Sequence, residues 1–401
     1  MNTMNKFEAN GSEGRARRRR TLGALVGACA LAFAMSGAHA DSRDQAKRIH
    51  DRIAGVPPDA ATLDAMAADI QGGNPAAAAQ KAMDASAFYT VTLKNFVTPW
   101  TNRDQTVFAP LNDYTATVIG MVRDDVPFNT VLSADLAYVG NSGLGLPAYS
   151  VSNNDHYQQL EDRGLDLKAS LVSSTQSSLN GLPAAATAGV ITSRAAAQAF
   201  FIAGTNRAMF RFTLLNHLCK DMENVHDTTR PPDKIRQDVA RSPGGDSRIF
   251  LNGCIGCHSG MDPMAEAFAY YNFDETQARI IYTAGAVQPK YLINSDNFKS
   301  GFVTPDDHWE NRWRAGPNQL LGWDLALPGS GNGAKSMGQE LASSDQFAHC
   351  QAEKVFKNVC LRAPGNIPDR GKVTSMAASF KSGGYKMKQL FADAAVYCMG
   401  D

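Results

Sequence analysis

The sequence has no net charge and, beyond its first 40 residues, no apolar run long enough to cross a membrane. The 401 residues include 39 Lys and Arg against 39 Asp and Glu. Six of the basic and two of the acidic residues lie in residues 1–40, so the remainder has 33 basic and 37 acidic residues. This mildly acidic balance offers no electrostatic footprint for nucleic acid, and we expect no nucleic-acid partner. With 44% hydrophobic residues, the chain has enough apolar material for a sizeable core.

Familiar catalytic motifs are also missing. The sequence contains no GxSxG, no HExxH and no phosphate-binding loop. The adjacent carboxylates at 124–125 and 306–307 are typical of solvated turns. Cysteine is scarce, with seven residues in the whole chain, so the positions at which it occurs are informative.

The first 40 residues have the pattern of an export signal. The basic run RARRRR at 15–20 precedes the apolar stretch TLGALVGACALAFAM at 21–35. Ala38 and Ala40 then provide small side chains at the cleavage positions. The apolar stretch is too short for a membrane anchor, and the apolar residues after Cys29 argue against lipid attachment there. We expect cleavage after Ala40 and an exported bacterial protein, periplasmic or at the cell surface, with no transmembrane segment in the mature chain.

The stretch LNGCIGCHSGMDP at 251–263 contains a close pair of cysteines. Two residues separate Cys254 from Cys257, and His258 follows directly. This spacing suits thioether bonds from two thiols to the two vinyl groups of a haem, with the adjacent imidazole on the iron. The sequence therefore predicts one covalent haem c, anchored by Cys254 and Cys257, with His258 as the proximal iron ligand.

Two alternatives for this cysteine pair fit less well. A zinc site needs two further ligands at short spacing, and the sequence has no second cluster. A redox-active CxxC usually follows a strand and opens a helix, whereas glycines surround this one. Asp262 and Pro263 are typical of a helix cap and of the first helical position. We therefore expect a helix to begin there, with SGMDP serving as scaffold.

The sequence leaves the second axial ligand of the iron open. Met261 and Met264 follow His258 too closely to reach the opposite face of the porphyrin. Met337, in the Gly-rich GAKSMGQE, is the leading candidate, His308 is the next, and a vacant site is a further alternative. The other candidates are Met209, Met222, Met376, Met387, Met399, His217, His226 and His349.

The other cysteines of the mature chain predict disulfides. Cys219, Cys350, Cys360 and Cys398 make an even number in an exported protein, the setting in which disulfides persist. Cys350 and Cys360 lie ten residues apart in a helical segment, which separates them by about 15 Å, too far for a bond. Cys350 then pairs with Cys219 or Cys398, and Cys360 with the other, unless all four are buried free thiols.

Helical periodicity dominates the rest of the chain. We expect a mainly α, multi-helical fold with a haem c-binding helical domain and a small irregular or β-hairpin insertion. The expected segments are an N-terminal helical domain at 41–145, a loop-rich connector at 146–185, a haem-binding helical segment at 186–275, the insertion at 276–334 and a C-terminal helical segment at 335–401. Within them the patterns predict helices at 42–54, 127–140, 156–162 and 262–273, and a hairpin within 278–294.

Parts of the chain resemble known families. GVITSRAAAQAFFIAGTNRAMFRFTLLNHLC at 189–219, followed by CIGCHSGMDPMAEAFAYYNFD at 254–274, is similar to the cytochrome-c-associated domain families first noted in planctomycetes. LASSDQFAHCQAEKVFKNVCLR at 341–362 resembles their companion domain, and RIHDRIAGVPPDAATLDAM at 48–66 resembles a helical segment of related proteins. The resemblance implies an exported haem c protein of mainly helical fold and implies no particular reaction.

Three functions agree with these features. The first is electron transfer to a redox partner protein, because the sequence offers a haem and no other chemistry. The second is a haem-dependent oxidoreductase with an open distal site. The third is a surface or complex-forming subunit in which the haem is structural. The sequence favours the first, an exported monohaem c-type cytochrome acting in electron transfer.

Overall fold

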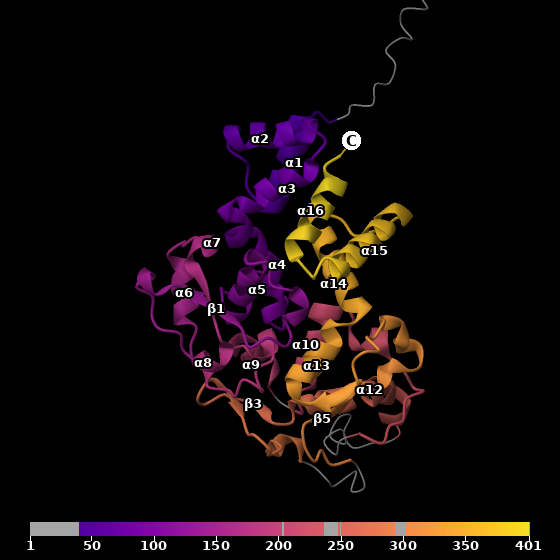
Figure 1. The fold of residues 1–401 in the computed structure, drawn as a ribbon. Coiled ribbons are helices and arrows are strands. Elements are labelled where there is room, and N and C mark those ends of the chain that lie inside the picture. The colour runs from indigo at the N-terminus through magenta and orange to yellow at the C-terminus, as the bar shows by residue number, and fades with distance from the viewer. Residues whose placement is uncertain (1–39, 203, 236–247, 249, 293–301, 401) are drawn as a thin grey trace, which may run out of the picture. The chain divides into compact units, whose positions relative to one another are not determined.

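Figure 1 shows the computed structural model of the chain. The structure describes residues 40–202, 204–235, 248, 250–292 and 302–400. The export signal expected in residues 1–40 lies outside the described residues, apart from Ala40. Asp41–Gly400 form one compact unit, which spans all the segments expected to follow the export signal. The boundaries between those segments stay predictions.

The prediction of a mainly α fold is confirmed, and α1 (Ser42–Ala54) illustrates how local sequence sets a helix. The Asp41 side chain caps α1 by accepting from the backbone N–H of Asp44, and Gly55 ends it with φ 75°. The other α-helices are α2 (Ala60–Gln71), α3 (Pro75–Asp84), α4 (Lys94–Val97), α5 (Asp113–Arg123), α6 (Asp155–Asp162), α7 (Leu167–Ser170), α8 (Gln176–Asn180), α9 (Arg194–Phe200), α10 (Arg207–Leu218), α12 (Ile255–Ala265), α13 (Gly333–Ala342), α14 (Asp345–Cys360), α15 (Ile367–Ser382) and α16 (Met387–Cys398).

Short antiparallel strand pairs and single helical turns connect these helices. The pairs are β1 (Ala137–Gly140) with β2 (Leu171–Ser174), β3 (Tyr271–Asp274) with β4 (Arg279–Tyr282), and β5 (His308–Glu310) with β6 (Ser330–Asn332). The turns of 3₁₀- or π-helix are η1 (Phe88–Leu93), η2 (Thr98–Thr101), η3 (Phe128–Thr130), η4 (Ser142–Leu144), η5 (Gly189–Thr192), η6 (Met222–Val225), η8 (Phe250–Cys254), η9 (Glu266–Phe268), η10 (Pro289–Tyr291), η11 (Arg312–Arg314) and η12 (Pro317–Leu321).

The prediction of a helix at 127–140 is wrong. Those residues form η3 and then β1, whose Tyr138 is in register with Ser173 of β2. The Tyr138 ring lies against Gly120 of α5, where an added Cβ would come within 2.1 Å of it. A strand partner from more than 30 residues downstream and a tight ring contact override the local helical pattern.

The hairpin expected within 278–294 forms further upstream. β3 pairs with β4 in the register Tyr271↔Tyr282 to Asp274↔Arg279, so the hairpin covers 271–282. The sequence pattern places residues 271–273 at the end of a helix that begins at Asp262. That helix instead starts earlier, as α12, and passes through η9 before the strand. Residues 293 and 294 of the expected hairpin lie outside the described residues.

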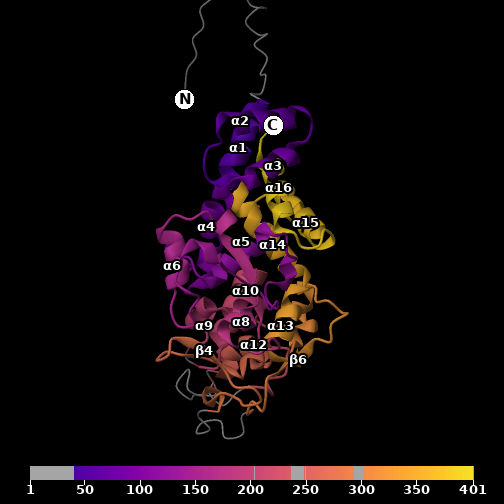
Figure 2. The same cartoon turned by 60° about the vertical axis from the view of Figure 1, so that its left-hand side comes forward.

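The N-terminal helices lie against the C-terminal ones. α1 and α3 both contact α16, as Figures 1 and 2 show from two directions. Arg52 Nη1 donates to the Cys398 carbonyl at 2.7 Å, and Gln45 Nε2 donates to the Gly400 carbonyl at 2.8 Å. The rings of Phe88 and Phe391 meet edge-on at 5.0 Å. The two ends of the described chain are therefore built into one core.

The two disulfides tie α14 to its neighbours. Cys219, at the end of α10, bonds Cys350 with a Cα–Cα distance of 5.3 Å. Cys360, at the end of α14, bonds Cys398 of α16 at 5.5 Å. Both distances are typical of disulfides. The expectation of two disulfides is confirmed, and the structure decides between the two pairings that the spacing allowed.

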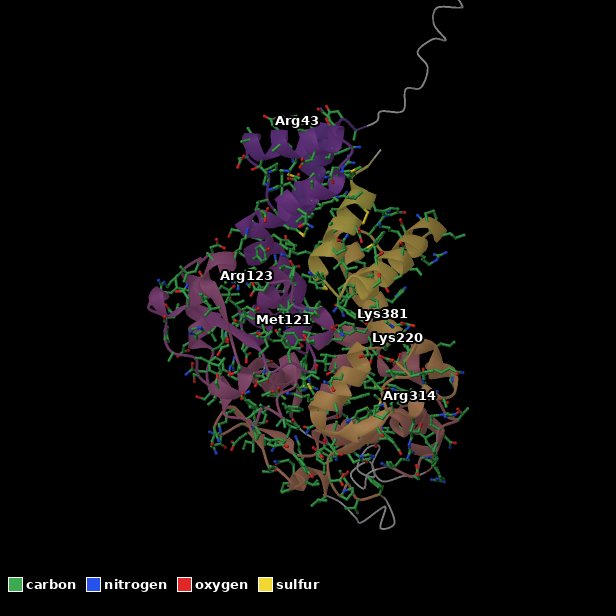
Figure 3. All side chains as sticks on the ribbon, viewed as in Figure 1. Arg43, Met121, Arg123, Lys220, Arg314 and Lys381 are labelled. Atoms are coloured by element: carbon green, nitrogen blue, oxygen red, sulfur yellow. A yellow bond between two sulfur atoms is a disulfide. The ribbon has the colours of Figure 1, made fainter. Side chains whose placement is uncertain are left out.

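Side chains fill the space between the helices (Figure 3), and they include buried ion pairs. Arg314, labelled there, donates from Nε and Nη2 to the two carboxylate oxygens of Glu340 at 2.8 and 2.7 Å. Glu340 is 1% exposed and also accepts from Asn311 Nδ2 at 2.7 Å. The Arg314–Glu340 ion pair links η11 to α13. In the part of the chain that the structure describes, no helix combines the length and apolarity needed to cross a membrane.

Candidate haem-attachment site

The CIGCH residues lie at the start of α12. η8 leads directly into α12, with Cys254 at the junction at φ −111° and ψ −25°. Residues i, i+3 and i+4 of a helix share one face, so Cys254, Cys257 and His258 are on the same side. The helical start thus brings together all three residues that the sequence predicts to hold haem.

This face of α12 is accessible. Cys254, Cys257 and His258 are each partly exposed, although α12 is mostly buried from Ser259 onward. Both cysteines are free, in contrast to the four in disulfides. Leu251, one turn before Cys254, is 54% exposed. An apolar group that covered Leu251 would gain favourable burial of apolar surface.

The surroundings of Cys257 differ from those of a redox-active cysteine. Its Sγ donates a weak hydrogen bond to the Met222 carbonyl at 3.5 Å. Burial raises the pKa of the Cys257 thiol, and coulombic interactions with Cys254, Glu223 and Asp221 raise it further. Reactive CxxC cysteines have a lowered pKa in electropositive surroundings. The local charge therefore does not favour the redox-active alternative.

The opposite face of α12 packs closely because two glycines occupy it. Gly256 and Gly260 are one turn apart, and an added Cβ would lie 2.2 Å from Nε2 of His226 and 1.9 Å from Nε1 of Trp313, respectively. The Asp227 N–H donates to the Gly256 carbonyl at 2.9 Å. At 100° per residue, Gly256 points about 200° away from His258. His226 therefore lies behind the helix, a position that does not favour it as the second iron ligand.

Gly260→Ala is expected to destabilise the fold. Trp313 is fully buried, so its ring has no room to move away from a new methyl group. Overpacking of this kind costs about 1–3 kcal/mol. Gly253→Ala is the matched control, because an added Cβ there meets nothing within 4 Å. Urea unfolding of both variants measures the difference, and equal stabilities would contradict the close packing of Gly260 against Trp313.

The prediction that a helix begins at Asp262 is wrong. Asp262 lies in the interior of α12, as does Pro263. Its side chain is 0% exposed, and its Oδ1 is 3.0 Å from Nδ1 of His258 and 3.1 Å from Nε of Arg207. An ionised carboxylate only accepts hydrogen bonds. In the neutral ring, Nδ1 of His258 therefore carries the proton and Nε2 carries the lone pair with which a histidine binds a metal.

Asp262 and Arg207 are the site residues that sequence reasoning missed. The sequence shows that Asp262 follows His258 by four residues. This spacing makes the two side chains neighbours only if the helix extends through CIGCH. Arg207 comes from α10, 55 residues upstream of Asp262, and the sequence offers no pattern that links them. Only the packing of α10 on α12 brings this guanidinium to the site.

The candidates for the second iron ligand lie in several parts of the fold. Met337 is fully buried on α13, which packs against η9, and its role stays a prediction. His308 begins β5, which contacts α12. His217 is buried and its Nε2 is 2.7 Å from the Tyr114 hydroxyl; burial holds the pKa of His217 well below its ordinary value. The others lie on η6 (Met222), α10 (Met209), α14 (His349), α15 (Met376) and α16 (Met387), or follow α16 (Met399).

The residues present fit a covalent haem c. Two free thiols share one accessible face with an imidazole whose Nδ1 contacts a buried carboxylate, next to an exposed apolar side chain. The described residues contain no group of three or more His, Cys, Asp and Glu side chains placed to hold a metal ion by themselves. Comparisons with protein-family models, curated proteins and solved structures found no match for this chain. The resemblance to the cytochrome-c-associated families stays a prediction.

Proposed function

We propose that this protein is an exported monohaem c-type cytochrome acting in electron transfer. Cys254 and Cys257 would form the two thioether bonds, and His258 would bind the iron through Nε2. A haem held in this way supplies a one-electron carrier that alternates between ferric and ferrous states. The chain's own residues anchor the group, orient the imidazole and leave this face open to a redox partner protein.

One observation carries the proposal. Among the described residues the disulfides use Cys219, Cys350, Cys360 and Cys398, and only the pair on the His258 face of α12 is free. A cysteine pair kept as free thiols in a protein that forms disulfides elsewhere needs a separate use. The histidine beside it, whose Nδ1 lies 3.0 Å from the Asp262 carboxylate, supports haem attachment as that use.

The disulfides support the proposed location. Two disulfides are typical of proteins that mature outside the cytosol. Covalent attachment of haem c to such a protein would take place after export, in the periplasm or at the cell surface. A protein partner that exchanges electrons would approach the accessible face of α12.

A haem-dependent oxidoreductase is the second candidate, and the His258–Asp262 contact is the observation that favours it. A carboxylate on Nδ1 makes the imidazole a stronger donor to iron. Such a ligand supports an enzyme as well as an electron carrier when the distal position is open. The occupancy of that position separates the two candidates.

Absorption spectra of the mature protein, produced in a host that attaches haem c, test the proposal. We expect pigment that acidified acetone does not extract, and a ferric spectrum of the low-spin type that cyanide and peroxide leave unchanged. A high-spin ferric spectrum that shifts on adding cyanide would instead support the oxidoreductase.

His258→Ala is expected to reduce the yield of stable pigmented protein more than tenfold, because loss of a second-shell partner alone costs about 10–100-fold at metal sites. His226→Ala is the matched control, since that ring lies behind α12. Equal yields of stable pigment from the two variants would contradict the role assigned to His258.

A further inference from the structure

A buried charge cluster lies directly beneath the proposed iron ligand. Oδ1 of Asp262 is within 3.1 Å of Nδ1 of His258 and of Nε of Arg207, and Nη2 of Arg207 is 3.5 Å from Oδ2. The Asp262 side chain is 0% exposed, whereas those of His258 and Arg207 are 18% and 22% exposed. The cluster thus extends from the partly exposed face into the interior.

Stabilising the helix does not explain Asp262. Asp and Pro both disfavour the interior of a helix, yet Asp262 and Pro263 occupy it. Pro263 also lacks the N–H that would donate to the Ser259 carbonyl. Burial of a carboxylate costs more free energy than an ion pair usually returns. The position of Asp262 therefore costs free energy, and its contact with His258 points to a role in the chemistry of that residue.

The contact changes how strongly the imidazole donates to a metal. When Nδ1–H donates to a carboxylate, Nε2 becomes more basic. A more basic ligand stabilises ferric iron more than ferrous iron, because the ferric ion has the higher charge. Arg207 acts in the opposite sense, since its guanidinium draws charge from the same carboxylate oxygen.

On the basis of the proposed function, we propose that Asp262, oriented by Arg207, is a positioning residue that lowers the reduction potential of the haem by making His258 a more strongly donating ligand. The role requires no contact between Asp262 and haem. It makes α10, which provides Arg207, part of the redox machinery.

The test uses two matched pairs of variants in the full mature protein carrying haem. Asp262→Asn should raise the ferrous-to-ferric ratio at fixed potential about tenfold, equivalent to a rise of about 59 mV for one electron. Arg207→Gln should lower that ratio, because the carboxylate becomes a better acceptor. Spectroelectrochemical titration measures both shifts. Arg207→Gln also keeps the proposal testable if Asp262→Asn does not fold.

Asp221 and Arg211 provide the controls. Arg211 lies one turn after Arg207 on α10 and forms a bidentate pair with Asp221 at 2.6 Å, and the Asp221 charge acts on Cys257. Asp221→Asn and Arg211→Gln therefore remove equal charges near the site without touching His258. Asn also retains the capping role that Asp221 has at η6. We expect either control to change the ratio less than twofold.

Paramagnetic proton NMR of the ferric protein separates ligand donation from a general charge effect. The shifted ring-proton resonances of His258 should move in Asp262→Asn and stay in place in Asp221→Asn. Equal shifts of potential in these two variants, with unchanged His258 resonances, would overturn the role of Asp262 and leave the proposed function intact. Absence of covalent haem from the unmodified protein would overturn the proposed function itself.

Discussion

Replacing Cys254 and Cys257 together with alanine is expected to abolish covalent haem. These residues are the free cysteines on the accessible face of α12, and each thioether bond needs one thiol. Stained denaturing gels and pyridine haemochrome spectra of the exported protein should show no attached pigment. Each single variant should keep at most one thioether bond, which alters the haemochrome spectrum because one vinyl group remains unreacted.

The matched control for this experiment also removes two cysteines. Cys219→Ser with Cys350→Ser eliminates a disulfide at the far end of α10 and leaves Cys254, Cys257 and His258 in place. We expect that variant to carry covalent haem whenever it accumulates in folded form. Covalent pigment that persists after loss of both Cys254 and Cys257 would show that haem attachment through α12 is wrong.

Loss of the Cys219–Cys350 disulfide is expected to have the largest effect on stability. This bond closes a loop with a sequence separation of 131 residues, whereas Cys360–Cys398 closes one of 38. Constraint of the unfolded chain by loops of these lengths corresponds to about 5 and about 4 kcal/mol, respectively. The free energy of unfolding should therefore fall by several kcal/mol in either double serine variant, and further in the one that lacks Cys219–Cys350.

Urea unfolding of the two double serine variants at equal protein concentration measures which one loses more free energy of unfolding. The long loop includes α12 with His258 and Asp262, and its ends join α10 to α14. Removal of Cys219–Cys350 should therefore also loosen the attachment of α10 to α14. Mass spectrometry with and without reductant checks the pairing directly. Recovery of a Cys219–Cys398 or Cys350–Cys398 bond from the native protein would contradict the structure.

The sequence alone predicted the features that depend on short spacing. α1 lies at the expected residues because Asp41 caps it and Gly55 ends it, and both effects act within a few residues. The short helix expected at 156–162 is α6. The prediction of a haem site at Cys254, Cys257 and His258 rests on spacing in the same way, since two cysteines and a histidine within five positions need only one helical turn to share a face.

Contacts between distant segments explain the expectations that failed. The strand β1 exists because β2 lies beside it, and a local apolar pattern does not reveal that partner. The early start of α12 has a comparable cause. Its glycine face is stabilised by packing on Trp313 and by a hydrogen bond from Asp227, which outweighs the glycines and the proline.

The amino-acid sequence by itself determined the helical class, the number of cysteines available for disulfides and the spacing that predicts haem attachment, because these depend on residue type and near neighbours. Tertiary structure decided which cysteines pair and which groups surround the His258 ring. Both depend on groups that come together only when the chain folds: Cys219 with Cys350 across 131 residues, and Arg207 with Asp262 across 55. Burial then gives these contacts their strength, since the Asp262 carboxylate is removed from water where it meets His258.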